Sequence, residues 1–242
     1  EKTPSFTVSA SKGIYKCFGC GKGGNAVSFV MDHEHYSYPE ALKYLAEKYN
    51  IEVVEKKLTP EQSIRANDRD SLYVISSFAN KFFQEQLWET KGGKAIGLSY
   101  YKERGFLEET IKKFQLGYSP KQKDLFSKTA IKSSFQLKYL EDSGLSIVKN
   151  ESALDRFRER MMFPIHSFSG RILGFGGRTL QKDNKAKYVN SPESLIYLKS
   201  KILYGIYFAK QHISKLNNCY IVEGYTDVIS LHQAGVENVV SS

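Results

Sequence analysis

Cysteine is scarce in this 242-residue sequence: there are only three, and two of them form one Cys-x2-Cys pattern at Cys17 and Cys20. So few cysteines exclude a disulfide scaffold and are typical of proteins from a reducing compartment. The sequence also lacks a signal peptide and any apolar run of the roughly 20 residues that a membrane-spanning helix needs. We therefore expect a cytoplasmic protein with no membrane partner.

Negative charge is also in short supply. The chain has 35 Lys and Arg against 26 Asp and Glu, a net charge of +9. The excess is local, because residues 156–187 carry 8 basic and 2 acidic side chains, whereas residues 1–50 are close to neutral. A basic run is most often a solvated face, but here glycines and aromatic residues alternate with the cations. That mixture favours a nucleic-acid partner.

An amino-terminal methionine is absent, and the chain ends at Ser242, directly after an apolar stretch that is typical of a strand. We therefore expect the sequence to be part of a longer protein, with an incomplete site. The length itself suits one large domain or two smaller ones.

Residues 1–50 predict a small unit of short strands and helices. Alternating residues at 7–9 and 14–16 indicate a hairpin, and a tight knuckle follows at 17–21. Helices are expected after Asn25 and after Ser37, where Glu40 completes a capping box. The charged stretch 51–62 reads as a linker.

The next part of the chain has helical periodicity. A long helix is expected from Thr59 to about Glu89. Shorter helices are expected over residues 94–104, 107–115, 122–132 and 135–142. Glycines stand where helices would end, at Gly105, Gly117 and Gly144.

From residue 161 the hydrophobic period changes to two, which predicts a hairpin of strands 162–166 and 171–175. A helix over 204–216 and a β-α-β run then follow. The run comprises a buried strand at 219–222, a helix at 226–233 and a strand at 236–241. It implies a parallel sheet with a right-handed crossover, and it makes Cys219 a core residue rather than a ligand.

The Cys17–Cys20 knuckle is half of a zinc-ribbon pattern. Gly19 and Gly21 allow the turn that brings both thiolates to one ion. A structural zinc site needs four ligands, and His33 and His35 are rejected because residues two apart on a helix point to different faces. The alternative is a bare turn whose cysteines are merely small residues.

The basic hairpin combines glycines with cations. Gly174, Gly176 and Gly177 would let the backbone pass close to a ligand, and Arg178 could then form a bidentate contact with a phosphate. Lys187, Tyr188 and Asn190 add a cation, a stacking ring and an amide, a combination that suits an unpaired strand. The alternative for Tyr188 is a half-buried strand aromatic.

One pair of carboxylates stands near the end of the chain. Glu223 follows the expected parallel strand at its carboxyl end, where ligand sites form in open α/β sheets, and Asp227 lies on the first turn of the next helix. Such carboxylates can hold magnesium or accept a proton. Asp227 could alternatively just stabilise the helix N-terminus. Two-metal phosphoryl transfer uses more carboxylates, and only Glu237 lies downstream.

Taken together, these motifs resemble bacterial replicative DNA primases of the DnaG type. The stretches 1–6 and 15–21 resemble the zinc-binding domain of that family. The stretches 156–165, 174–178, 187–193 and 221–227 resemble its polymerase domain and the start of its Toprim fold. The resemblance covers essentially the whole sequence, with several motifs in one order.

The resemblance implies an α+β fold: a partial zinc ribbon, then a mixed helical and β-hairpin subdomain that leads into the start of a Toprim α/β sheet. The expected domains are the partial zinc ribbon at 1–50, a linker at 51–62, the N-terminal subdomain of the RNA polymerase core at 63–215 and the truncated start of Toprim at 216–242.

The implied function is the magnesium-dependent synthesis of short RNA primers on single-stranded DNA from ribonucleoside triphosphates. The match assigns structural zinc to Cys17 and Cys20, and general-base or magnesium chemistry to Glu223, with Asp227 beside it. It assigns the DNA-binding face to a set of mostly basic residues: Arg104, Arg178, Lys187, Tyr188, Asn190 and Lys199. The family further implies a monomer at the nucleoid, with a replicative helicase bound through a carboxy-terminal domain that this sequence lacks.

Two departures limit these expectations. The family's first zinc pair would lie before Glu1, and its magnesium-binding Asp-x-Asp would lie beyond Ser242. The 242 residues alone should therefore be inactive and hold zinc weakly. Two alternatives remain: another Toprim enzyme, either a topoisomerase or a nuclease, and a single-strand binding module without activity.

Overall fold

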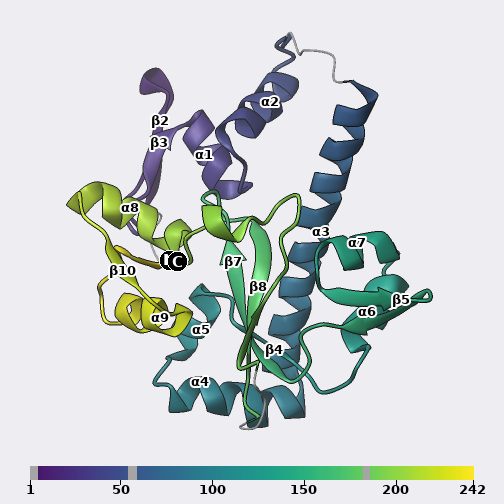
Figure 1. Ribbon diagram of the computed structural model, residues 1–242. Helices are drawn as coiled ribbons and strands as arrows, with labels where there is room; N and C mark the ends of the chain where they lie inside the picture. Colours follow the sequence, from purple (N-terminus) through teal and green to yellow (C-terminus); the bar gives the residue numbers. More distant parts are fainter. Residues whose placement is uncertain (1–4, 54–58, 182–185) are drawn as a thin grey trace. The chain divides into compact units, whose positions relative to one another are not determined.

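The computed structural model describes residues 5–53, 59–181 and 186–242. The chain divides into two compact units, one made of residues 1–58 with 169–171 and the other of the remaining residues (Figure 1). Helices and several small sheets alternate along the chain, which confirms the expected α+β class. In the described ranges, no helix is long and apolar enough to cross a membrane.

The first unit is a small three-stranded antiparallel sheet with two helices. Its elements are β1 (Phe6–Ser9), the short 3-10 helix η1 (Ala10–Lys12), β2 (Ile14–Cys17), β3 (Gly23–Asn25), α1 (Ala26–His33) and α2 (Tyr38–Lys48). The predicted hairpin and both helix starts are confirmed. The Asn25 side chain accepts a hydrogen bond from the Ser28 backbone at 2.9 Å, and the Ser37 backbone N–H donates to Glu40 at 2.8 Å.

The second unit begins with the 30-residue helix α3 (Pro60–Glu89), as the periodicity predicts. Its first turn is closed by Thr59, whose hydroxyl accepts a hydrogen bond from the Gln62 backbone at 3.2 Å. The helix buries Ile75, Ala79 and Phe83, which lie at helical spacing on one face, and that face packs against the sheet of this unit.

That sheet has four antiparallel strands in the order β4-β7-β8-β9. They are β4 (Gly117–Ser119), β7 (Arg160–His166), β8 (Ile172–Thr179) and β9 (Tyr188–Asn190). The predicted hairpin is therefore confirmed and is longer at both strands. Met162, Phe163 and Phe175 are buried in the core that the sheet shares with α3.

Short helices and one small hairpin surround this sheet. They are the π-helix η2 (Gly93–Leu98), α4 (Ser99–Glu103), α5 (Glu108–Lys113), α6 (Leu125–Lys132), α7 (Leu137–Asp142), β5 (Ser146–Lys149) and β6 (Ser152–Asp155). The four predicted short helices are confirmed in position, and the first of them begins as a π-helix. The β5–β6 hairpin, with strands of four residues each, was not predicted.

The chain ends in a β-α-β unit. The unit comprises β10 (Tyr220–Val222), α9 (Tyr225–Gln233) and β11 (Val239–Ser241), and it is preceded by η3 (Lys199–Lys201) and α8 (Ile206–Leu216). The strands β10 and β11 are parallel, as predicted. The prediction that β10 is buried is wrong, because Ile221 is 72% exposed and Cys219 is also exposed. In the described residues, β10 pairs with β11 alone and keeps an open edge.

One predicted helix end is also wrong. Gly105 and Gly144 end helices in the left-handed conformation, with φ of +80° and +66°. Gly117 does not: it lies in β4, where a Cβ atom would come within 2.6 Å of the Phe83 side chain. The left-handed residue after α5 is Gln115 instead, with φ of +54°. Gly117 is therefore needed for the close approach of β4 to α3.

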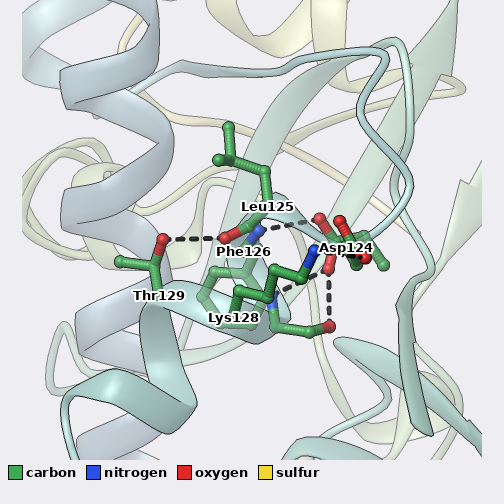
Figure 2. A network of polar contacts seen from close by, with 7 residues as sticks. Asp124, Leu125, Phe126, Lys128 and Thr129 are labelled. Atoms are coloured by element: carbon green, nitrogen blue, oxygen red, sulfur yellow. Dashed lines mark hydrogen bonds and ion pairs between the residues drawn. The ribbon is translucent and has the colours of Figure 1, made fainter.

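A buried carboxylate fixes the start of α6, the turn whose Asp124, Phe126 and Lys128 are labelled in Figure 2. Asp155, at the end of β6, is 5% exposed and accepts hydrogen bonds from the backbone of Phe126 and Ser127, both at 2.8 Å, and from the Ser127 hydroxyl at 2.6 Å. It satisfies backbone N–H groups that the first turn of a helix leaves without partners. On the outside of the same turn, Lys128 pairs with Asp124 at 3.0 Å.

We expect Asp155→Asn to destabilise the second unit by about 2 kcal/mol, because the amide offers one acceptor oxygen where the carboxylate serves three donors. Asp124→Asn is the matched control. It breaks only the surface pair with Lys128 and should cost no more than about 0.5 kcal/mol. Urea unfolding of both variants checks this, and equal losses would contradict a capping role for Asp155.

Candidate nucleic-acid interface and acidic pocket

Two aromatic rings enclose Arg178 at the end of β8. Its guanidinium carbon lies 5.1 Å from the centre of the Tyr100 ring and 5.6 Å from the centre of the Tyr188 ring. The β8–β9 register sets this arrangement, because Arg178 is directly opposite Tyr188. Arg104 directly follows α4, and its guanidinium carbon lies 5.7 Å from the centre of the same Tyr100 ring. Three residues predicted for the DNA-binding face are thus linked through Tyr100.

The sequence patterns did not predict a role for Tyr100. It is 8% exposed, and burial raises its pKa although the guanidinium groups of Arg178 and Arg104 oppose that rise. The hydroxyl is therefore neutral near pH 7, and its oxygen accepts a hydrogen bond from Arg178. An apolar α4 face with adjacent tyrosines is typical of a helix core, so only the packing shows that this ring faces two cations.

The segment with Lys187 and Tyr188 is held by a buried guanidinium. Arg160 is 6% exposed and donates to the carbonyl oxygens of Gly177 at 3.1 Å, Ala186 at 3.0 Å and Lys187 at 3.4 Å. Burial lowers its pKa. The Lys187 carbonyl also accepts a hydrogen bond from the Thr179 backbone at 3.0 Å. Arg160 therefore holds the backbone of residues 186–187 against β8, while the Lys187 side chain is exposed.

The glycines of β8 serve a different purpose from the one predicted. A Cβ atom would lie 2.5 Å from the Tyr225 ring at Gly176, 2.7 Å from Phe157 at Gly177 and 3.0 Å from Ser191 at Gly174. The prediction that they admit a ligand close to the backbone is therefore wrong. They admit other side chains of the protein.

The two carboxylates share a pocket with part of the predicted DNA-binding face. The cavity, of about 360 Å³, is lined by Tyr188, Asn190, Lys199, Glu223, Gly224, Tyr225, Thr226, Asp227 and Ser242. Glu223 follows β10 directly and Asp227 lies on the first turn of α9, and both are exposed. Asp227 also accepts a hydrogen bond from the Gly224 backbone at 3.2 Å, so it stabilises the start of α9 as well.

Tyr225 joins this pocket to the sheet. Its ring stacks on Tyr204 with centroids 4.1 Å apart and 16° between the planes. Burial raises the pKa of Tyr225, while a side-chain hydrogen bond with Asn190 lowers it. Because its ring also occupies the space beside Gly176, Tyr225 fixes the turn between Glu223 and Asp227 against β8 and β9.

The far end of α9 is fixed to the turn that follows Arg104. The Gln233 side chain accepts a hydrogen bond from the Leu107 backbone at 2.9 Å and donates to the Gly105 carbonyl at 2.8 Å. Glu237, the one downstream carboxylate, lies beyond this end of the helix. It pairs with Lys113 at 3.0 Å and with His212 at 2.8 Å.

The cysteine knuckle in the first unit has the geometry of a half-site for a metal. Gly21 takes the left-handed conformation at φ of +76°, and its N–H donates to the Cys17 carbonyl at 2.9 Å. Hydrogen bonds from the Cys20 backbone and the Ser5 hydroxyl lower the pKa of Cys17 to about 7. Thiolates are the ligands that zinc prefers, so the two cysteines fit half of a tetrahedral site.

The histidines near the end of α1 do not complete the zinc site. Helix α1 ends at His33, which contacts Glu34, and His35 lies outside the helix with φ of +57°. Within residues 5–53, 59–181 and 186–242, no group of three His, Cys, Asp or Glu side chains is placed to hold a metal ion.

Comparison with known families decides which proteins share these features. Residues 82–210, just over half of the chain, match the family described as the DNA primase catalytic core, N-terminal domain, and residues 1–61 match the CHC2 zinc finger. The chain belongs to the bacterial DnaG-type DNA primase family. The zinc-finger match supports zinc as a cofactor of this primase sequence.

Individual relatives agree with this assignment. The DNA primase of Halalkalibacterium halodurans is 45% identical over 246 residues, which span 100% of this chain and 40% of the relative. The chain thus spans about two fifths of the length of the curated primases that it matches.

Solved primase structures share the fold. The zinc-binding and RNA polymerase domains of the Aquifex aeolicus primase match with a TM-score of 0.66 and 34% identity, over 100% of this chain and 57% of that one. A DnaG primase catalytic domain bound to ssDNA matches with a TM-score of 0.65 and 37% identity, over 73% and 55%.

The Cys17–Cys20 half-site can be tested in the full-length primase. We expect Cys17→Ser or Cys20→Ser to lower zinc retention, because each removes one thiolate from the site. Cys219→Ser is the control, since Cys219 is exposed in the other unit. Zinc content after dialysis against a chelator checks this, and wild-type retention in the Cys17 and Cys20 variants would exclude them as ligands.

Proposed function

We propose that the whole protein synthesises short RNA primers on a single-stranded DNA template during DNA replication. The observation that carries this proposal is the single pocket that Glu223 and Asp227 share with Tyr188, Asn190 and Lys199. The family membership and the ssDNA-bound primase relative support it. Carboxylates next to a cation and a stacking ring suit phosphoryl chemistry on a nucleic-acid strand.

The template would follow the cations that surround the Arg178 stack. Arg104, Arg178 and Lys187 would contact backbone phosphates, and the half-exposed Tyr188 ring would stack on a base. Lys199 and Asn190 line the pocket with the carboxylates, so they would contact the strand close to the reacting groups. None of these contacts reads a base edge in a groove, so binding should have little sequence preference and a steep salt dependence.

The reaction would be nucleotidyl transfer. The 3′ hydroxyl of the primer attacks the α-phosphate of an incoming ribonucleoside triphosphate, a new P–O bond forms, and the bond to the β-phosphate breaks to release pyrophosphate. Glu223 is the candidate for accepting the hydroxyl proton or holding magnesium. Magnesium, when bound, would offset the negative charge of the phosphates. Glu223 and Asp227 are carboxylates that fit such an ion, although two fall short of a complete two-metal set.

The remaining expectations belong to the same proposal. Residues 1–50 would be the zinc-binding domain, 63–215 the N-terminal subdomain of the polymerase core and 216–242 the start of Toprim. The partners would be the template, the ribonucleoside triphosphates, the RNA primer and a replicative helicase, with the enzyme acting as a cytoplasmic monomer at the nucleoid.

Glu223→Gln in the full-length enzyme should reduce primer synthesis by about 10²-fold or more, because the amide can neither accept a proton nor carry charge. Binding to single-stranded DNA should be nearly unchanged. Glu85→Gln, an exposed change on α3, is the control. Primer synthesis at the wild-type rate would remove Glu223 from the chemistry. Metal-dependent nicking of supercoiled DNA by the wild type, without primers, would indicate a nuclease or topoisomerase instead.

Tyr100→Leu should weaken binding to single-stranded DNA about 5- to 30-fold, because it removes the ring that holds both Arg104 and Arg178. Tyr100→Phe keeps the ring, so its loss of binding free energy should be less than half of the loss in Tyr100→Leu. The matched control is Tyr139→Leu, which removes the ring under Lys138 elsewhere in the second unit. Fluorescence anisotropy with a labelled oligonucleotide checks this. Equal effects of Tyr100→Leu and Tyr139→Leu would contradict a role for Tyr100 in DNA binding.

A further inference from the structure

Two stacked tyrosine rings lie behind the acidic pocket. One belongs to Tyr225, the first residue of α9, and the other to Tyr204, just before α8. Tyr204 is not among the residues that line the pocket. We propose that Tyr204 is a positioning residue for the reaction, because its ring fixes Tyr225 and, through it, the carboxylate of Glu223. This inference rests on the proposed function, in which Glu223 takes part in nucleotidyl transfer.

The backbone of Tyr204 is fixed to the strand beside Glu223. Its N–H donates to the Ser241 carbonyl at 2.8 Å, and its carbonyl accepts a hydrogen bond from the Ser241 N–H at 3.1 Å. In the β10–β11 register, Ser241 is the partner of Val222, the residue before Glu223. Only the strand β11 therefore separates the backbone of Tyr204 from the start of the Glu223 turn.

The ring of Tyr204 reaches the other side of the same turn. It stacks on Tyr225, two residues after Glu223, with centroids 4.1 Å apart and 16° between the planes. The ring of Phe163 on β7 lies 6.3 Å from that of Tyr225, at an angle of 56°. Tyr204 is thus linked to the chain on both sides of Glu223, through Ser241 before it and through Tyr225 after it.

The Glu223 turn has little packing of its own. Glu223 is exposed and Gly224 has no side chain, so Tyr225 is the first residue after β10 whose side chain packs against the hydrophobic core. The hydrogen bond from the Gly224 backbone to Asp227 stabilises the start of α9, but both partners belong to the turn itself. The position of Glu223 relative to the pocket wall therefore depends on how the Tyr225 ring is held.

The face of the Tyr204 ring, rather than its hydroxyl, makes this contribution. Tyr204 is 3% exposed, and burial raises its pKa well above the ordinary value, so the hydroxyl stays neutral. Among the described residues, that hydroxyl has no hydrogen-bond partner. Two nearly parallel rings in contact restrict each other's tilt, whereas an aliphatic side chain would fill the space without setting the plane of Tyr225.

Loss of this stack should affect the chemical step more than binding. A misplacement of about 1 Å in a reacting group can cost about 10²-fold in rate, because attack requires aligned atoms. The proposed template contacts of Arg178 and Lys187 come from β8 and from the segment before β9, which Tyr204 does not hold in place. A change confined to kcat is the kinetic result expected when only the positioning of a reacting group is lost.

The test is Tyr204→Leu in the full-length enzyme, with primer synthesis measured over a range of ribonucleoside triphosphate concentrations. We expect kcat to fall about 10- to 100-fold. The KM for the nucleotide and the affinity for oligodeoxythymidine should stay within about twofold of the wild type. Tyr204→Phe keeps the ring, so its kcat should be within about twofold of the wild type.

Tyr118→Leu is the matched control. Tyr118 is also 3% exposed in the same hydrophobic core, but it lies on β4. Its replacement should lower the melting temperature as Tyr204→Leu does and leave kcat close to that of the wild type, when all variants are assayed well below their melting temperatures.

Tyr225→Leu keeps the inference testable if Tyr204→Leu does not fold, because it removes the other ring of the stack from a less buried position. It should lower kcat at least as much as Tyr204→Leu. In a Glu223→Gln background, neither leucine variant should lower the residual activity further, because the effects of residues that act through one group are not additive.

Three outcomes would overturn the positioning role: equal losses of kcat in Tyr204→Leu and Tyr118→Leu, equal losses in Tyr204→Leu and Tyr204→Phe, or a further loss in the Glu223→Gln background. Wild-type turnover in Tyr204→Leu or Tyr225→Leu would also overturn it, and the proposed function would stand as long as Glu223→Gln is impaired. Wild-type primer synthesis by Glu223→Gln would instead remove Glu223 from the chemistry, and this inference would fall with it.

Discussion

The proposed site depends on the buried guanidinium of Arg160. A cation that is 6% exposed must be compensated by hydrogen bonds, and here three backbone carbonyls of β8 and of the segment before β9 do this. Because β9 has only three residues, its own ladder would hold it weakly. Arg160 adds contacts that place Lys187 and Tyr188 beside Arg178. The placement of Lys187 and Tyr188 therefore depends on this interior cation together with the β8–β9 register.

The carboxylates are placed by a second set of contacts, from both ends of α9. At its start, the stacked and hydrogen-bonded Tyr225 ties the Glu223 turn to Asn190 on β9. At its end, Gln233 binds the backbone on either side of the turn after Arg104. Helix α9 thus runs from the acidic pocket to the turn that follows Arg104. These contacts connect α9, and with it the pocket, to the turn that follows Arg104.

Sequence patterns predicted what depends on near neighbours. The capped starts of α2 and α3, the β7–β8 hairpin and the parallel β10–β11 pair all follow from local periodicity and turn residues. The pattern also predicted that Glu223 and Asp227 lie close together, and both line one pocket. It could not show that Tyr100 contacts Arg178, 78 positions away, or that Gly117 makes room for Phe83. Such roles depend on packing between distant segments, so no local pattern of the sequence carries them.

The glycines of β8 bear on the sequence preference that the proposed DNA-binding face would have. A glycine-lined backbone in contact with the ligand could distinguish ligands by shape. The space beside Gly174, Gly176 and Gly177, however, is occupied by side chains of the protein itself. In the proposed binding mode, contacts with a strand would fall to long cationic side chains and to one half-exposed ring, which would act on phosphates and on the faces of any base. A surface of this kind would hold many template sequences equally well. If the enzyme selects its start sites, that choice has to be made by residues outside the β8–β9 face.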